Sequence, residues 1–236
     1  MKKIVCFILL VYSIMLSALS VNALGTGFET QSMTDDRMDD IISGIELVSL
    51  KDEPYKKAVL CFDVNNDGKI AIGQYSTDRK TVCVYTDDGV YQYGFSFNTS
   101  GDFALEWNGN DLNIYFVRGS FIVSVTENGE IIDVAQVTST IENNSYKNRI
   151  RYATEKSIGD KRYTLEHDMG IMNWFSSTFS QVTVNENGTE WIVYDASASK
   201  ISNTIVASVI VIICLAVAIT VIIWNVKKVQ NTTYNR

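Results

Sequence analysis

A stretch that resembles a calcium-binding loop is the clearest candidate for chemistry in this chain. Within CFDVNNDGKIAIGQ, three side chains with oxygen atoms stand at the spacing of an EF-hand loop: Asp63, Asn65 and Asp67. Such a loop needs a bidentate glutamate at its twelfth position, where this chain has Gln74. Its flanks also alternate like strands, whereas an EF-hand is flanked by helices. The stretch therefore favours a β-hairpin turn that ends at Gly68, and its oxygen-bearing side chains are weak metal candidates only.

No motif in the sequence indicates a catalytic residue. The only histidine is His167, which register places at the end of a strand where packing or hydrogen bonding sets its role. Nucleophile elbows, metalloprotease histidine pairs, Cys-x-x-Cys pairs and phosphate-binding glycine loops are missing from the sequence. A glycosidase needs two facing carboxylates, but the adjacent acids read as solvated surface: Asp35-Asp36, Asp39-Asp40 and Asp87-Asp88. We therefore predict no enzyme activity and no cofactor.

Trp174 and Phe175 are the predicted binding residues. They lie in IMNWFSS (171–177), which interrupts a run of strands with apolar bulk, as a binding loop does. Their rings could stack on a sugar or anchor a protein partner. Most of the other aromatic side chains are expected to fill the space between sheets.

The first 23 residues have the pattern of a secretory signal peptide. Met-Lys-Lys is followed by an apolar run from Ile4 to Leu19 and by the small-residue site Val21-Asn22-Ala23. Cleavage after Ala23 is therefore expected. The alternative is an uncleaved anchor, because a run of this length nearly spans a tilted bilayer.

Residues 205–224 are predicted to form a transmembrane helix. This stretch has no charged residue, and about 20 residues at ~1.5 Å rise match a hydrocarbon core of ~30 Å. Trp224 stands where an interfacial aromatic belongs, and Lys227 and Lys228 follow it without a nearby acid. This positive-inside pattern predicts a cytoplasmic tail at 225–236 and a single-pass protein of the cell membrane with its bulk outside.

The acidic residues are all confined to the part of the chain between the two apolar segments. All 27 aspartates and glutamates lie between Leu24 and Lys200. A surface of this charge repels phosphate backbones and anionic lipid. Nucleic acid is therefore excluded as an expected partner.

Cys61 and Cys83 are the only cysteines in the exported part. Two cysteines outside the membrane invite a disulfide. However, a strand is expected between theirs, and next-but-one strands lie about 9.6 Å apart, beyond the ~7 Å limit for bridged Cα atoms. The spacing favours two buried thiols over a disulfide.

One turn recurs after alternating apolar residues. It appears in VCVYTDDG, IVSVTENG and QVTVNENG, which end at Gly89, Gly129 and Gly188. Asp/Asn-Gly in this setting is a strong hairpin signal, because both residues accept a positive φ. Each turn follows a second strand in register: KIAIGQ, DLNIYF and RYTLEH. No long helical pattern is expected between these strands, and 138–161 is expected to supply a degenerate hairpin.

These repeats define units at 59–97, 103–137 and 162–196. The first two resemble bacterial extracytoplasmic β-propeller repeats, and the third is similar but looser. The resemblance implies an all-β domain of four-stranded blades, as a propeller or a propeller arc, in which IELVSL (45–50) could close the ring beside the last unit. A β-sandwich or an ordinary meander is the alternative.

The predicted layout is a signal helix at 1–23, a polar segment at 24–43, a propeller-like domain at 44–197, the membrane helix and the tail. The predicted function is a membrane-anchored binding or scaffold module with a cell-surface protein or glycan as its partner. The alternatives are a carbohydrate-active enzyme that uses acidic residues and a structural subunit of a membrane complex. Facing carboxylates in a cleft would favour the enzyme, and an unpaired sheet edge would favour the subunit.

Overall fold

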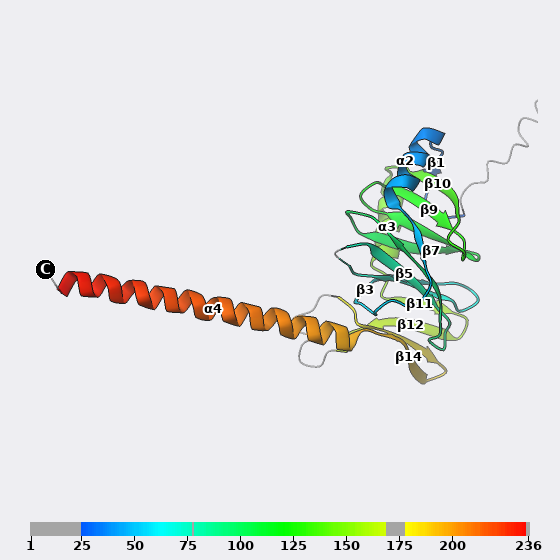
Figure 1. The fold of residues 1–236 in the computed structure, drawn as a ribbon. Helices are drawn as coiled ribbons and strands as arrows, with labels where there is room; N and C mark the ends of the chain where they lie inside the picture. Colours follow the sequence, from blue (N-terminus) through cyan, green and yellow to red (C-terminus); the bar gives the residue numbers. More distant parts are fainter. Residues whose placement is uncertain (1–24, 77, 169–177, 235–236) are drawn as a thin grey trace, which may run out of the picture.

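Three antiparallel sheets form the body of the protein, and one long helix extends away from them (Figure 1). The computed structural model describes residues 25–76, 78–168 and 178–234, and within α4 it describes only part of the side chains. The expected signal segment lies outside the described residues. The all-β character expected for the body is confirmed.

Each sheet contains a four-stranded meander. Sheet 1 consists of β2 (Val48–Leu50), β6 (Tyr91–Phe97), β5 (Lys80–Tyr85), β4 (Ile70–Gln74) and β3 (Val59–Val64), in that spatial order. Sheet 2 consists of β1 (Thr30–Gln31), β10 (Ile131–Val137), β9 (Phe121–Val125), β8 (Asp111–Phe116) and β7 (Phe103–Asn108). Sheet 3 consists of β11 (Glu155–Ile158), β12 (Lys161–Glu166), β13 (Gln181–Glu186) and β14 (Thr189–Asp195).

The expected hairpin turns are confirmed. The loop at 65–68 joins β3 to β4, with Val64 opposite Ile70 and Gly68 at a φ of 80°. Gly89 and Gly129 have φ values of 85° and 84°, and Gly188 has 87°. Glycine adopts the left-handed region without strain, whereas other residues are strained there. The turn sequences therefore predicted these positions correctly.

The three units match the sheets closely but not fully. Units 59–97 and 103–137 coincide with β3–β6 and β7–β10. The third sheet begins earlier than predicted, with β11 at Glu155. The segment IELVSL does not lie beside the last unit, because β2 pairs with β6 of sheet 1.

Two helices correct the expectation that helices are confined to the chain ends. The polar segment 24–43 contributes β1 and most of α2 (Asp35–Ile45), and 138–161 holds α3 (Ile141–Arg151) before β11. The Thr140 hydroxyl caps α3 by accepting a hydrogen bond of 3.1 Å from the Asn143 amide. The arginines in its last turn interact favourably with the negative end of the helix dipole.

Sheet 1 lies between the other two sheets and is buried on both faces. Alternate residues of its strands face opposite ways, so Cys61, Ala71 and Val82 pack against sheet 2. Phe62, Ile72 and Cys83 pack against sheet 3. Cys61 and Cys83 therefore sit on opposite faces, and both are free buried thiols, as expected.

The second face of sheet 2 is covered by α3 and the chain before β1. Phe28 stacks on Tyr115 with ring centroids 4.7 Å apart and meets Tyr146 of α3 edge-on at 4.7 Å. Ala104 and Ile122 complete this small core. The spatial order is therefore α3, sheet 2, sheet 1, sheet 3, although the four-stranded meander of sheet 1 comes first in the chain.

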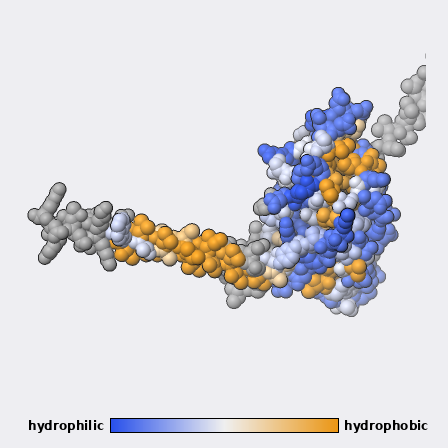
Figure 2. All heavy atoms as spheres, viewed as in Figure 1, coloured by the Kyte–Doolittle hydropathy of each residue, from blue (hydrophilic) through white to orange (hydrophobic). Residues whose placement is uncertain are grey.

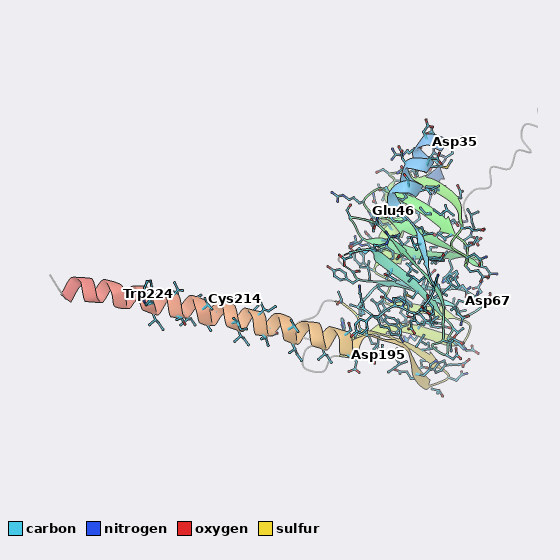
Figure 3. The ribbon with its side chains drawn as sticks, in the orientation of Figure 1. Asp35, Glu46, Asp67, Asp195, Cys214 and Trp224 are labelled. Carbon is cyan, nitrogen blue, oxygen red and sulfur yellow. The ribbon has the colours of Figure 1, made fainter. Side chains whose placement is uncertain are left out.

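The last strand leads directly into α4 (Ser197–Tyr234), which extends away from the sheets (Figures 1 and 3). Its described side chains from Ile205 to Trp224 are mostly apolar and exposed, and Figure 2 shows them as a continuous apolar surface. Within the described residues, no helix has the combined length and hydropathy of a membrane crossing.

Gly73 tests the tight packing of sheet 1 on sheet 2. A Cβ atom at this position would lie 2.6 Å from Cys61 Sγ and 2.8 Å from the Phe103 ring. We expect Gly73→Ala to lower the free energy of unfolding by about 1–3 kcal/mol, because the buried neighbours must move. The measurement is urea denaturation of the full chain in detergent.

The matched control is Gly44→Ala in α2, where an added Cβ meets nothing within 4 Å. Alanine should raise stability there by up to about 1 kcal/mol through its helix propensity. Equal effects of the two substitutions would contradict the packing of sheet 1 against sheet 2.

Candidate functional sites

The three weak metal candidates do not converge on one point. The Asn65 carboxamide oxygen accepts hydrogen bonds from the amides of Asp67 (3.0 Å) and Lys69 (2.8 Å), which shapes the turn. Asp67 is exposed at the turn (Figure 3), whereas Asp63 is buried between sheets. Gln74 is buried and donates to Cys83 Sγ at 3.4 Å. No cluster of three or more metal-ligating side chains occurs in the described part of the chain.

Asp63 instead joins all three sheets. From β3 of sheet 1, its carboxylate accepts a hydrogen bond of 2.8 Å from the Trp107 amide of sheet 2. The Trp107 indole donates to the Asp63 carbonyl at 3.2 Å. Lys156 of sheet 3 forms an ion pair with the same carboxylate. Burial raises the pKa of the Asp63 carboxyl, and the Lys156 ammonium opposes that shift without cancelling it.

A second polar link connects sheets 1 and 3. Asp87, in the turn between β5 and β6, forms an ion pair with Lys161, and its carbonyl accepts a 2.6 Å hydrogen bond from the Trp191 indole. The Lys161 ammonium also lies 5.9 Å from the centroid of the Trp191 ring. Asp87 is thus a connecting residue between sheets, whereas the sequence had indicated solvated surface.

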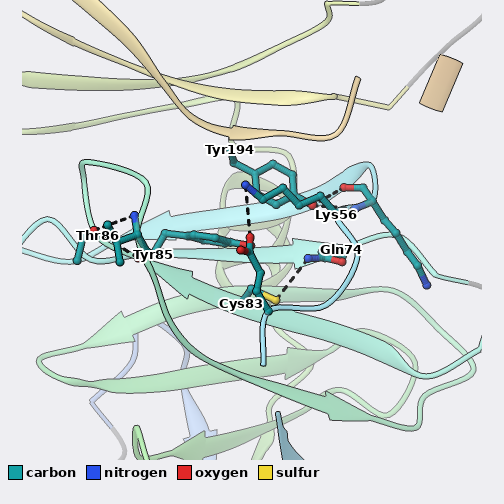
Figure 4. A network of polar contacts seen from close by, with 9 residues as sticks. Lys56, Gln74, Cys83, Tyr85, Thr86 and Tyr194 are labelled. Carbon is teal, nitrogen blue, oxygen red and sulfur yellow. Dashed lines mark hydrogen bonds and ion pairs between the residues drawn. The ribbon is translucent and has the colours of Figure 1, made fainter. Parts of the chain in front are cut away.

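A tyrosine and lysine network holds the loop before β3 beside the start of α4 (Figure 4). Lys56 lies 5.5 Å from the Tyr85 ring centroid and 5.4 Å from that of Tyr194. Tyr85 donates to Glu53 at 3.0 Å, and the Tyr194 hydroxyl donates to the Lys57 carbonyl at 2.6 Å. Burial raises the pKa of both phenols, so they stay protonated and serve as fixed donors.

The buried thiols offer no reactive nucleophile. Burial raises the pKa of Cys83 to about 12 and moves the pKa of Cys61 well above its ordinary value. Because the thiolate is the reactive form, both side chains are inert at neutral pH. They act as small apolar residues of the core.

His167 takes a packing position. It follows β12, and its ring stacks on that of Phe179 with centroids 4.6 Å apart. The side chain is exposed, whereas register had placed it on an inward strand. The stacked arrangement agrees with a structural role.

Two hollows in the described part of the chain have mostly apolar walls. A pocket of about 480 Å³ lies between the loop at 53–56 and the first turn of α4. A more enclosed pocket of about 300 Å³ lies at the start of β3, where Leu60, Leu165 and Phe179 give apolar walls. Its charged lining residues, Asp102 and Arg151, form an ion pair with each other. Because these two charges neutralise each other, the pocket suits a neutral ligand. Asp102 is the only carboxylate among the described residues that line it.

The predicted binding residues Trp174 and Phe175 lie outside the described residues. The structure therefore places neither of them. Asp63, which links the three sheets, did stand out in the sequence, but as a metal candidate. A charged residue inside the apolar strand LCFDV was the signal that could have indicated a buried ion pair.

Comparisons with protein-family models, with curated proteins and with solved structures gave no match to this chain.

Lys156→Met tests the junction at Asp63. The Asp63 side chain is 9% exposed and that of Lys156 is 37% exposed. Removal of the ammonium leaves a buried carboxylate without its cation, so we expect a loss of about 1–3 kcal/mol at pH 7. The pKa of Asp63 should rise further, because the group that lowers it is gone. The destabilisation relative to the wild type should therefore grow as the pH rises through the raised pKa of the folded Asp63 carboxyl, and it should shrink towards acidic pH.

Urea denaturation at pH 4 and pH 7 measures both effects. The matched control is Arg162→Met, which removes an ion pair to Glu155 whose side chains are 61% and 46% exposed. We expect that change to cost less than about 0.5 kcal/mol at either pH. A Lys156 variant as mild as this control, or more destabilised at pH 4, would disprove the role given to the junction.

Calcium should contribute little to stability. Asp63 is engaged by Lys156 and the Trp107 amide, and Asn65 by two backbone amides. The unfolding temperature of the full chain in detergent should differ by less than about 1 °C between chelator and millimolar calcium. An increase of many degrees would show a tight site that these contacts do not indicate.

Proposed function

We propose that this chain is a non-catalytic binding or scaffold module of the cell surface, held to the membrane by α4, although the described residues alone contain no helix with the length and hydropathy of a membrane crossing. The single observation that supports it most is the apolar surface of α4. Ile205, Val209, Ile213, Val217 and Trp224 are each about half exposed or more. Apolar surface gains about 25 cal/mol for each Å² removed from water, and a bilayer would remove all of it.

The charge pattern supports the proposed orientation. The stretch 205–224 carries no charge and is followed by Lys227 and Lys228, whereas the acidic residues all precede it. Basic residues beside a span favour the cytoplasmic side. We propose that the sheets lie outside the cell and that 225–236 lies inside, with 1–23 as the export signal.

We also propose that the sheets are blade-like modules of an open, propeller-like arc. The support is their common plan of a four-stranded meander and the recurring turn. Thr86 and Thr126 make the same 3.0 Å amide-to-carbonyl bond across their turns, to Val90 and Glu130. An arc fits better than a ring, because α3 covers the second face of sheet 2, while sheet 3 packs on sheet 1.

A cell-surface protein or glycan remains the proposed partner. Rigid cross-links such as those of Asp63 and Asp87 favour a module that presents a fixed surface. The enclosed pocket beside Arg151 gives a glycan one specific location, since apolar walls and an ion pair suit a neutral sugar.

Membrane attachment is tested by placing charges in α4. Val211→Arg combined with Leu215→Arg puts two cations one turn apart near the centre of the proposed span, at about 2.5–3.5 kcal/mol each. We expect the wild-type chain to remain in the membrane pellet after alkaline carbonate extraction and the double variant to move into the supernatant. Ile141→Arg, at an 80% exposed apolar position of α3, is the matched control and should stay in the pellet.

Topology is tested separately by protease treatment of intact cells. The sheets should be digested, and a small C-terminal fragment should survive. Outside labelling of a tag at the C-terminus, or a wild-type chain released by carbonate, would reject the membrane-anchored arrangement.

A further inference from the structure

The outer edges of the three sheets are not treated alike. In sheet 1, β2 covers the outer edge of β6, with Val48 opposite Ser96 and Leu50 opposite Gly94. In sheet 2, β1 covers the end of the outer edge of β10, with Thr30 opposite Val137 and Gln31 opposite Gln136. In sheet 3, β14 pairs with β13 alone among the described strands.

The strand β14 otherwise resembles its two counterparts. β6, β10 and β14 each have seven residues, and each carries one extra residue against its inner neighbour. The edge of β14 is therefore long enough to template another strand, because each unpaired residue presents backbone groups to a neighbour.

The strand is held firmly in place. Tyr194 and Val193 are buried against sheet 1, and the Trp191 indole is bonded to Asp87. Ile192 points to the other face and is 52% exposed. A rigid edge loses little conformational entropy when a strand is added.

Two devices that normally block an edge, proline and lysine, are missing from β14, whose sequence is TEWIVYD. The strand does carry a bulge at Val193, but β6 and β10 also carry a bulge and still pair on their outer edges. Its charges are Glu190 and Asp195, near its two ends, and both are exposed. An added strand would therefore match best with basic residues near its ends and an apolar residue beside Ile192.

We propose that β14 accepts one extended segment of a partner protein as the fifth strand of sheet 3. The strand runs antiparallel to β14, as β2 and β1 do to the strands that they cover. We assign the segment to another protein, because within the described residues the two covering strands of this chain are already paired and the residues after β14 form α4. The inference rests on the proposed binding role and names the class of its partner. It does not depend on membrane attachment.

The test is selection from a library of random seven-residue peptides on the purified full chain in detergent. Enriched peptides should alternate apolar and polar residues, and synthetic copies should slow amide hydrogen exchange at 189–195. Methylation of alternate peptide amides, those that face β14, should abolish binding, whereas methylation of the intervening amides should leave it unchanged.

Ile192→Lys should weaken peptide binding by about tenfold or more, because a charge beside the added strand disfavours pairing. Ile132→Lys is the matched control, since Ile132 is 53% exposed on β10 of sheet 2, away from β14, and this variant should bind the peptide as the wild type does. Both positions are at the surface, and unchanged circular dichroism confirms that the variants fold.

Three outcomes overturn the proposal: no enriched sequence, protection of another part of the chain, or self-association that protects β14. Because the measurement is made in detergent, these outcomes leave the carbonate extraction result of α4 intact. The peptide selection thus tests the proposed strand site, and the carbonate extraction separately tests the membrane anchor.

Discussion

The arrangement of the sheets depends on one buried carboxylate. Asp63 belongs to a strand of sheet 1. Its carboxylate accepts a hydrogen bond from the Trp107 amide of sheet 2 and forms an ion pair with the Lys156 ammonium of sheet 3. Apolar packing alone is tolerant of small shifts between layers, because it has no direction. A buried charge does not tolerate such shifts, since it is stable only where its hydrogen-bond donors and its counter-ion lie within contact distance. The contact therefore sets how the three sheets align along their strands.

The same logic explains the composition of sheet 1. A sheet with two covered faces must be apolar on both, and β4 and β5 are buried along their whole length. Close approach to sheet 2 further requires Gly73, because its missing side chain leaves room for Cys61 and the Phe103 ring. The polar residues of this sheet are then confined to the turns and to contacts with partners, as at Asp63 and Gln74.

Local chemistry made the hairpins predictable, and distant contacts made the rest unpredictable. The turns at Gly68, Gly89 and Gly129 follow from positive φ, which adjacent residues encode. Helix α3 was missed because it is polar, and only a few of its side chains, such as Tyr146 and Ile150, dock on sheet 2. In α2, by contrast, Met38, Ile41 and Ile45 have helical spacing and pack on the core between sheets 1 and 2, so a signal was present.

The site residues illustrate the same division. Alternating oxygen-bearing side chains were visible at 63–67, but the donors of Asp63 come from residues 44 and 93 positions away. No spacing rule connects such positions, so a calcium loop and an ion-paired junction look alike in the sequence. The covering strands β1 and β2 have two and three residues, too few for a period of two to show. The pairing of sheet edges therefore had to come from the structure.

These constraints are the physical basis of our proposal that the protein presents a surface. Asp63 and Asp87 hold sheet 3 against sheet 1 by directed contacts, and Tyr194 of β14 also holds the loop beside α4. Movement of β14 relative to the start of α4 is thereby restricted, because the strand runs into the helix after Ala196. An edge strand held in this way keeps its backbone groups in register for an incoming chain. Backbone pairing needs this rigidity, since each hydrogen bond depends on the position of the one before it.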